Sequence, residues 1–329
     1  MGVISKELLL VIPGVLPSLT IALMGVMLGK IDINREVNHK TISNMVYYFL
    51  TPCMVFSTLH QRDFDFKEFA TIGGAALLLI AAMTPIAFSA KRLAKIRENG
   101  YCLPIIFMNT GNISLPIALL LFGTEGLAKA IMFHMVNILV LYSFGVYLVS
   151  GKSGIGQFLR IPALYATVLG ILVAKVSLPL PPLVQDVCSI AERGIDVLAL
   201  AAIPLLIVDL GYSMSQADLS QLRNGVTGAY LRVLLGPVLA LALIYCGRLL
   251  GLLPVGPGLD PATALWYRTT EAIIVLNAAM PGPIMAYLLN VKFENCPKQA
   301  ASMLMVGTLA GIVTVPFFLY VIKHFILTG

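Results

Sequence analysis

The stretch NTGNISLP, residues 109–116, places several polar residues and a proline inside a run that carries no charge from 99 to 124. A second stretch, NAAMPGP at 277–283, repeats this pattern inside an uncharged run from 272 to 291. A proline within a helix removes a backbone donor and clashes with the preceding turn. In hydrocarbon the carbonyls left without partners are costly unless protein or a watered cavity satisfies them. Both stretches therefore predict a helix that is broken in mid-membrane beside a cavity.

The composition indicates a membrane protein. Of the 329 residues 58% are hydrophobic and only 12% are charged, and the mean hydropathy is +0.91. A soluble domain has about 25% charged residues, so this chain is neither soluble nor disordered. The net charge of +6 lies in short loops between apolar runs, which indicates membrane topology rather than nucleic-acid binding. The five cysteines stand singly, so we expect no metal site and no redox motif.

The spacing of the charges predicts ten membrane helices and no soluble domain. Between 161 and 259 charges are frequent, and we expect three spans there, at about 161–178, 189–213 and 226–252. Proline-rich turns at 179–182 and 254–261 separate them. The first span lacks the features of a cleaved signal peptide and is expected to stay in the membrane. The other seven spans are uncharged windows near the length of about 20 residues that crosses a bilayer: 8–29, 41–61, 69–90, 99–124, 130–151, 272–291 and 299–322.

Loop charges predict the orientation. The loop at 91–97 holds Lys91, Arg92, Lys95 and Arg97, and an excess of basic residues marks the cytoplasmic side. Both termini then face outward, and we expect a bacterial inner (plasma) membrane protein. Lys129 is counted here among the loop charges of the opposite side.

Corresponding features in the two halves predict an internal duplication. Pro52 and Pro204 lie inside the apolar runs of the second and seventh spans, and the two stretches quoted above fall in the fourth and ninth. A five-helix unit repeated once inserts its second copy upside down. We therefore predict two inverted repeats, residues 1–158 and 159–329, with broken crossover helices four and nine, a pattern typical of transporters.

The broken helices predict a binding site for an anion. Their half-helices direct N-terminal N–H groups of partial positive charge into the cavity, and neutral amide and hydroxyl groups there hold a carboxylate without trapping it. For one stretch alone, a proline that only kinks a packed span explains the pattern equally well; two corresponding stretches favour a site. The predicted substrate-binding residues are Asn109, Thr110, Asn112, Pro116, Asn277, Pro281 and Pro283.

At these residues the sequence resembles the auxin efflux carrier family, which includes the plant PIN-type auxin carriers and many bacterial transporters. The resemblance covers nearly the whole chain. It is carried by the YYFLTP run ending at Pro52, the 109–116 stretch, the segment from Ile203 to Gly211, and AAMP at 278–281 with the following 302–316 segment. The resemblance implies ten helices in two inverted repeats, a scaffold and a transport domain, outward termini, and a homodimer formed through the scaffold.

The resemblance also implies where the substrate lies. In the family the anion binds near the crossover, which corresponds to Asn109, Pro116, Asn277 and Pro281 in this sequence. Two departures limit the comparison: only residues 151–160 connect helices five and six, where the plant carriers have a long loop, and Asn277 stands where they have Gln. We therefore expect a small organic anion, a mono- or dicarboxylate or an auxin-like acid, rather than auxin specifically.

Two acidic residues inside predicted spans are candidates for coupling to H⁺ or Na⁺, because ionisable groups in a membrane are costly. They are Asp209, after Pro204, and Glu271, at the start of the ninth span. A surface carboxylate beside Arg268 is the favoured alternative for Glu271.

Other polar residues in the spans have simpler interpretations. Arg232 is expected to snorkel to the cytoplasmic edge rather than to meet Asp209 or a substrate. His134 is expected to be a hydrogen-bonded packing residue. The cluster Glu192, Arg193 and Asp196 fits an ion pair at the outer helix ends as well as a transport role.

These patterns favour a secondary active transporter that works by alternating access. An enzyme is not expected, because the sequence lacks metalloprotease, serine-hydrolase and nucleotide-binding motifs. No cofactor is expected, and the partners are the substrate and the lipid bilayer. The alternative is a sensor or regulatory protein that binds a small anion on the same fold without transporting it; a channel is a weaker option.

Overall fold

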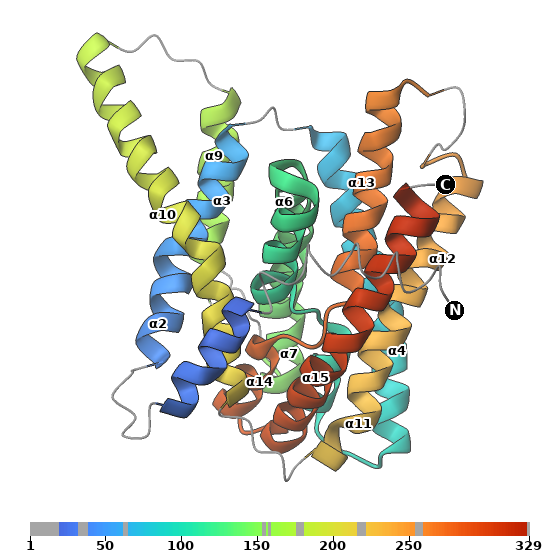
Figure 1. The fold of residues 1–329 in the computed structure, drawn as a ribbon. Helices are drawn as coiled ribbons and strands as arrows, with labels where there is room; N and C mark the ends of the chain where they lie inside the picture. Colours follow the sequence, from blue (N-terminus) through green and yellow to red (C-terminus); the bar gives the residue numbers. More distant parts are fainter. Residues whose placement is uncertain are drawn as a thin grey trace. The chain divides into compact units, whose positions relative to one another are not determined.

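The computed structural model describes residues 20–31, 39–61, 65–152, 156, 159–175, 181–215, 222–253 and 259–327. Within these residues the ordered elements are all helices, without a strand (Figure 1). The predicted all-α class is therefore confirmed. Several predictions lie outside the described residues: the beginning of the first span (8–19), both termini, and most of the turn at 254–261.

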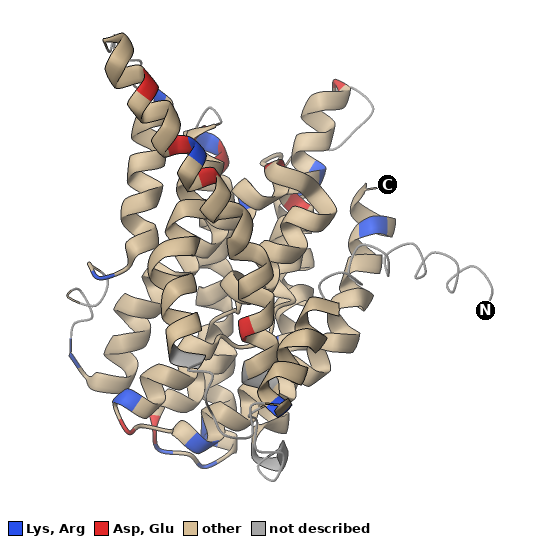
Figure 2. Cartoon of the chain, turned by 60° about the vertical axis from the view of Figure 1, so that its left-hand side comes forward, with Lys and Arg blue, Asp and Glu red and all other residues tan. Residues whose placement is uncertain are grey.

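Six helices in the described part of the chain are long and apolar enough to cross a membrane. Figure 2 shows that charged residues gather mainly toward helix ends. The chain is thus an integral membrane protein, while the count of ten spans stays a prediction. Two shorter apolar helices are Thr20–Ile31 and Pro162–Lys175. The six long segments are Thr41–His60, Phe66–Leu93, Asn99–Ser150, Pro182–Tyr212, Gly225–Leu249 and Pro297–Leu327.

The chain forms two compact units. The first contains the described residues within 69–158 and 217–329, and the second contains those within 17–68 and 159–216. Each unit thus draws on both predicted repeats, so the compact units are not the repeats themselves. The repeat boundary at 158 stays a prediction.

The second unit is built around α3 (Thr51–His60), which packs against α9 (Pro162–Lys175) and α10 (Pro182–Ser215). Before α3 come α2 (His39–Met45) and a π-helical turn, η1 (Val46–Leu50). Pro204 lies inside α10, which continues through it.

The helix Thr20–Ile31 also lies in the second unit, and the first unit contains the other helices. Its largest helix contact joins α11 and α15. Gly123 interrupts α6 with a φ of 64° and divides it into two helical parts, which separates the windows predicted at 99–124 and 130–151. The elements are α4 (Phe66–Leu93), η2 (Asn99–Cys102), α5 (Leu103–Ile106), η3 (Thr110–Ser114), α6 (Leu115–Val140), η4 (Leu141–Gly145), α7 (Val146–Ser150), α11 (Leu222–Tyr230), η6 (Leu231–Leu235), α12 (Gly236–Leu249), α13 (Pro261–Ala278), α14 (Ile284–Lys292), α15 (Pro297–Val321) and η7 (Ile322–Leu327).

One boundary differs from prediction. The span expected to start at 272 begins at Pro261, with Asp260 as its N-cap accepting hydrogen bonds from the Ala262 and Thr263 N–H groups. The uncharged window misplaced this boundary because Arg268 and Glu271 lie within α13 and are bonded to neighbouring helices.

Candidate functional site

The first break lies between α5 and η3. Helix α5 ends at Ile106, the backbone is extended at Phe107, and the π-helical turn η3 begins at Thr110. Pro116, expected to break the helix, is instead the second residue of α6. A proline in the first turn of a helix removes an N–H group that has no intrahelical partner, so it fits there without breaking the helix. The break therefore covers residues 107–109, and the expectation that Pro116 breaks the helix was wrong. Its place among the substrate-binding residues stays a prediction.

The second break lies between α13 and α14. Helix α13 ends at Ala278, the next five residues are not helical, and α14 begins at Ile284. Pro281 and Pro283 both lie in this break. Pro283 is the N-cap residue of α14 and makes no side-chain hydrogen bond. No capping side chain therefore accepts hydrogen bonds from the first N–H groups of this helix.

The two breaks touch each other within the first unit. The Asn109 N–H donates to the Pro281 carbonyl oxygen over 2.8 Å. A Cβ atom at Gly282 would lie 2.7 Å from the Pro104 carbonyl oxygen, so the second break also approaches α5 closely. The structure thus brings Asn109 together with Pro281, while Pro116 lies in the first turn of α6.

Two side-chain amides at the breaks are buried and only half satisfied. Asn109 is 4% exposed; its Oδ1 accepts from the Asn112 N–H over 3.3 Å, and its Nδ2 has no hydrogen-bond partner among the described residues. Asn277 is fully buried; its Nδ2 donates to the Ile273 carbonyl over 2.9 Å, and its Oδ1 has no such partner. A buried polar atom without a partner costs about 1–3 kcal/mol. One buried donor and one buried acceptor at the breaks therefore lack a partner among the described residues.

Thr110 belongs to a hydrogen-bond network that fixes the first break. Its Oγ1 lies 2.7 Å from His134 Nδ1. Asn137 Nδ2 donates to the same oxygen over 3.2 Å and to the Met108 carbonyl over 2.9 Å. Which of Thr110 and His134 donates in their bond depends on the tautomer of the His134 ring. The expected role of His134 as a hydrogen-bonded packing residue is confirmed.

Arg232 differs from its prediction. It is 1% exposed, and its Nη2 donates to the Ala278 carbonyl at the end of α13. Its Nη1 makes two long contacts of 3.5 Å, to the Ile105 and Ile106 carbonyls at the end of α5. The expectation that it snorkels to the membrane edge was wrong. The signal that would have identified it is a single charge inside an otherwise uncharged run from 224 to 247.

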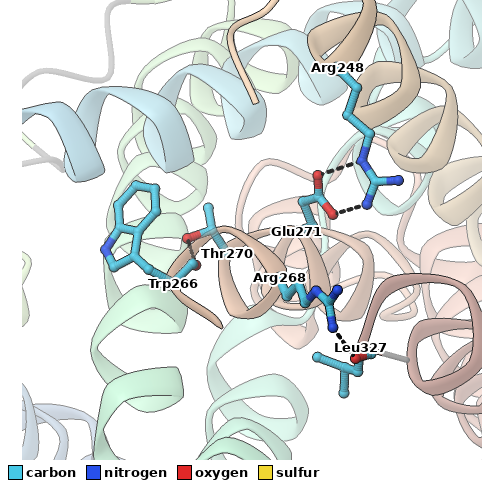
Figure 3. Close-up of polar contacts among 6 residues, drawn as sticks. All are labelled: Arg248, Trp266, Arg268, Thr270, Glu271 and Leu327. Atoms are coloured by element: carbon cyan, nitrogen blue, oxygen red, sulfur yellow. Dashed lines mark hydrogen bonds and ion pairs between the residues drawn. The ribbon is translucent and has the colours of Figure 1, made fainter. Parts of the chain in front are cut away.

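Glu271 is a buried ion-pair partner rather than a surface carboxylate. Figure 3 shows Arg248 facing Glu271, with Nε donating to Oε1 over 2.8 Å and a second bond joining Nη2 to Oε2. Glu271 is fully buried, so the surface interpretation was wrong. Arg268, its expected neighbour, donates instead to the Leu327 carbonyl over 2.8 Å. The role of Glu271 in ion coupling stays a prediction.

Lys129 is also buried, although its charge was assigned to a loop. It lies in α6, where its Nζ donates to Thr270 Oγ1 over 3.1 Å and sits 4.3 Å from the Trp266 ring centroid. Its ion pair with Glu125, at 3.2 Å, reaches the exposed side of the helix. An aromatic face, a hydroxyl and a carboxylate together offset the cost of burying this cation.

The remaining charged candidates lie in the second unit. Asp209, in α10, is 6% exposed and accepts from Ser43 Oγ over 2.6 Å. Asp196 accepts from Ser57 and Gln61 of the α3 segment, over 2.5 and 3.3 Å. A coupling role of Asp209 stays a prediction. Across the described ranges, no three His, Cys, Asp or Glu side chains are grouped to hold a metal ion.

We expect Glu271→Gln to destabilise the protein. The change removes the charge from a buried acceptor, and hydrogen bonds to charged groups contribute about 1.5–3 kcal/mol. Because Arg248 is 31% exposed, we expect about 2 kcal/mol, the lower part of that range. Thermal unfolding in detergent measures the loss. Glu98→Gln, at an exposed position, is the control and should change stability by less than about 0.5 kcal/mol. Equal melting temperatures for the two variants would show that the Arg248–Glu271 pair contributes nothing to stability.

Long apolar helices with irregular backbone and half-satisfied polar groups at two breaks are typical of membrane transporters. The family model described as membrane transport protein matches residues 10–158 and 153–319. The chain belongs to this family, the auxin efflux carrier family, and the predicted membership is confirmed.

Two archaeal proteins are similar to almost the whole chain. An uncharacterized transporter of Methanothermobacter thermautotrophicus is 24% identical over 315 residues, which cover 92% of this chain and 95% of the relative. An uncharacterized transporter of Methanocaldococcus jannaschii is 23% identical over 307 residues, covering 89% and 93%. Both names support a transporter as the general class.

Proposed function

We propose that the chain is a secondary active transporter that moves a small organic anion by alternating access around the two breaks of the first unit. The observation that carries this proposal is the pair of buried amides that each keep one unused polar atom, Asn109 Nδ2 and Asn277 Oδ1. Both belong to segments that lie at or beside the contact between Asn109 and Pro281.

The proposed binding chemistry follows from these atoms. Asn109 Nδ2 donates to a carboxylate oxygen of the substrate, and Asn277 Oδ1 accepts from a second polar hydrogen of the same molecule, such as a hydroxyl, N–H or protonated carboxyl group. The uncapped N–H groups at the start of α14 add partial positive charge. Because the amides carry no formal charge, the anion is held without being trapped. Pro281 and Pro283 keep the second break free of helix, and Asn112 holds the Asn109 amide in place.

The proposal also covers the coupling ion, the membrane location and the oligomeric state. Asp209 and Glu271 are the candidate sites for a coupling H⁺ or Na⁺. We place the protein in a plasma membrane with both termini outside and expect a homodimer, with inverted repeats at 1–158 and 159–329.

The test is uptake into proteoliposomes of labelled malate, malonate, succinate and indole-3-acetate, with and without pH or sodium gradients. We expect saturable uptake of at least one acid. Asn109→Ala should raise the KM for that acid about tenfold or more, because it removes a donor to a charged group. The control, Asn44→Ala, changes an exposed amide on α2 and should leave the KM unchanged.

Three results would contradict the proposal. Wild-type KM in Asn109→Ala would remove this amide from the site. Specific binding of an acid by folded wild-type protein, without uptake under any gradient, would identify the protein as a sensor on the same fold. Absence of both binding and uptake for all four acids would exclude this substrate class.

A further inference from the structure

The guanidinium of Arg232 joins the ends of two helices that the chain places far apart in sequence. It donates to the Ala278 carbonyl, the last residue of α13, and contacts the Ile105 and Ile106 carbonyls, the last residues of α5. Asn277 directly precedes Ala278, and Asn109 lies three residues after Ile106. One side chain thus connects the two helix ends that carry the two half-satisfied amides.

The residues around Arg232 favour its contact with the helix-end carbonyls. Within the described part of the chain no carboxylate pairs with it, so its charge faces only backbone carbonyls. The last carbonyls of a helix lack intrahelical partners and carry partial negative charge, which suits a cation. Gly236, one turn further on, leaves the necessary room: a Cβ atom there would lie 2.1 Å from Arg232 Nη2 and 2.5 Å from the Ala278 oxygen.

The shape of the side chain matters as well as its charge. The planar guanidinium presents two separate NH₂ groups, so one reaches α13 while the other reaches α5. A lysine has a single ammonium group on a flexible stem and cannot span both helix ends in the same way.

We propose that Arg232 is a positioning residue that fixes the spacing of Asn109 and Asn277 by bridging α5 and α13. The proposal rests on the function proposed above, because it assumes that these two amides bind the anion. Arg232 itself does not contact the substrate; it holds the groups that do.

Three variants test the bridge through the KM of the acid that wild-type protein takes up from the panel above. Arg232→Gln removes the planar guanidinium with its two NH₂ groups as well as the charge. Arg232→Lys keeps only the charge, and Gly236→Ala keeps the arginine but displaces it. We expect each to raise the KM at least about fivefold, with the maximal rate changed less than the KM. The control is Gly225→Ala, which crowds α11 against Ser302 and Met303 of α15 and should lower stability with the KM within twofold of wild type.

The KM pattern decides between positioning and general stability. Wild-type KM in Arg232→Lys would overturn the proposal, because charge alone would then suffice. A rise in KM for Gly225→Ala equal to that for Gly236→Ala would also overturn it, since any loss of stability would then have the same effect. If Arg232→Gln does not fold, Gly236→Ala and Arg232→Lys carry the test.

A second measurement is independent of transport. Asn112→Cys places a thiol on the half-buried turn after the first break, in a background with Cys53, Cys188 and Cys246 replaced by Ser. We expect Gly236→Ala to raise the rate of its reaction with N-ethylmaleimide about tenfold, and to leave unchanged the rate of the exposed Cys188 in a matching variant that retains it. An unchanged rate at position 112 would overturn the bridge. If the wild type transports no acid, the proposed function fails and this labelling rate alone decides the role of Arg232.

Discussion

Asn277→Asp is expected to abolish uptake of an organic anion at neutral pH. The substitution keeps the size of the side chain and places a carboxylate where a buried amide now has an unused oxygen. Two like charges about 4 Å apart repel by about 4 kcal/mol at an effective dielectric constant of 20, which corresponds to a loss of affinity of about a thousandfold. Asn277→Ala removes the amide without adding charge and should cost only about tenfold.

The measurement is the KM in proteoliposomes as a function of pH. Protonation of the new carboxyl group removes the repulsion, so uptake by Asn277→Asp should recover as the pH falls, while wild-type uptake at a fixed gradient should not show this recovery. Asn44→Asp, at an exposed position on α2, is the charge-matched control and should behave like wild type. Normal uptake by Asn277→Asp at neutral pH would show that the anion binds elsewhere.

Gly225→Ala is expected to give the largest loss of stability of any single methyl addition considered. A Cβ atom at Gly225 would lie 2.3 Å from the Ser302 carbonyl carbon and 2.4 Å from the Met303 nitrogen. Because both atoms belong to the backbone of α15, the two helices must separate over the largest helix contact of the first unit. Overpacking of this kind costs about 3 kcal/mol.

Thermal unfolding in detergent measures this effect, and Gly194→Ala is the matched control. Gly194 also lies within a helix, α10, but a Cβ atom there has no neighbour within 4 Å. Alanine is the better helix former by about 1 kcal/mol, so the control should be neutral or slightly stabilised. Equal melting temperatures for the two variants would mean that α11 and α15 do not pack as closely as described.

The sequence predicts most of the long helices in the described part of the chain because these helices are surrounded by hydrocarbon, while the count of ten spans stays a prediction. In a membrane, backbone groups must be satisfied within each segment, so uncharged length alone identifies most helices. The positions of both irregular segments were also indicated by Asn109 and Pro281, which the structure brings into contact. The expectation that Pro116 breaks the helix failed, because a proline has different effects in the first turn and in the interior of a helix. Only the structure shows where the first turn lies.

The charged residues inside the helices could not be assigned from the sequence. Hydropathy treats each charge as a cost and cannot show its partner. Glu271 pairs with Arg248, 23 positions away, and Lys129 bonds to Thr270, 141 positions away. Arg232 bonds to backbone carbonyls, which leave no trace in the side-chain sequence. Such partners are set by how helices pack, so they appear only in three dimensions.

The contact between the two breaks also has a consequence for biosynthesis. Asn109 and its acceptor Pro281 are separated by about 170 residues. At about 5–20 residues per second, the ribosome needs on the order of ten seconds or more to make the intervening chain. During that interval the non-helical backbone at Asn109 must already be inside the membrane or its insertion machinery without its final acceptor. We therefore expect the first broken helix to remain sensitive to insertion factors until the ninth predicted span has been inserted.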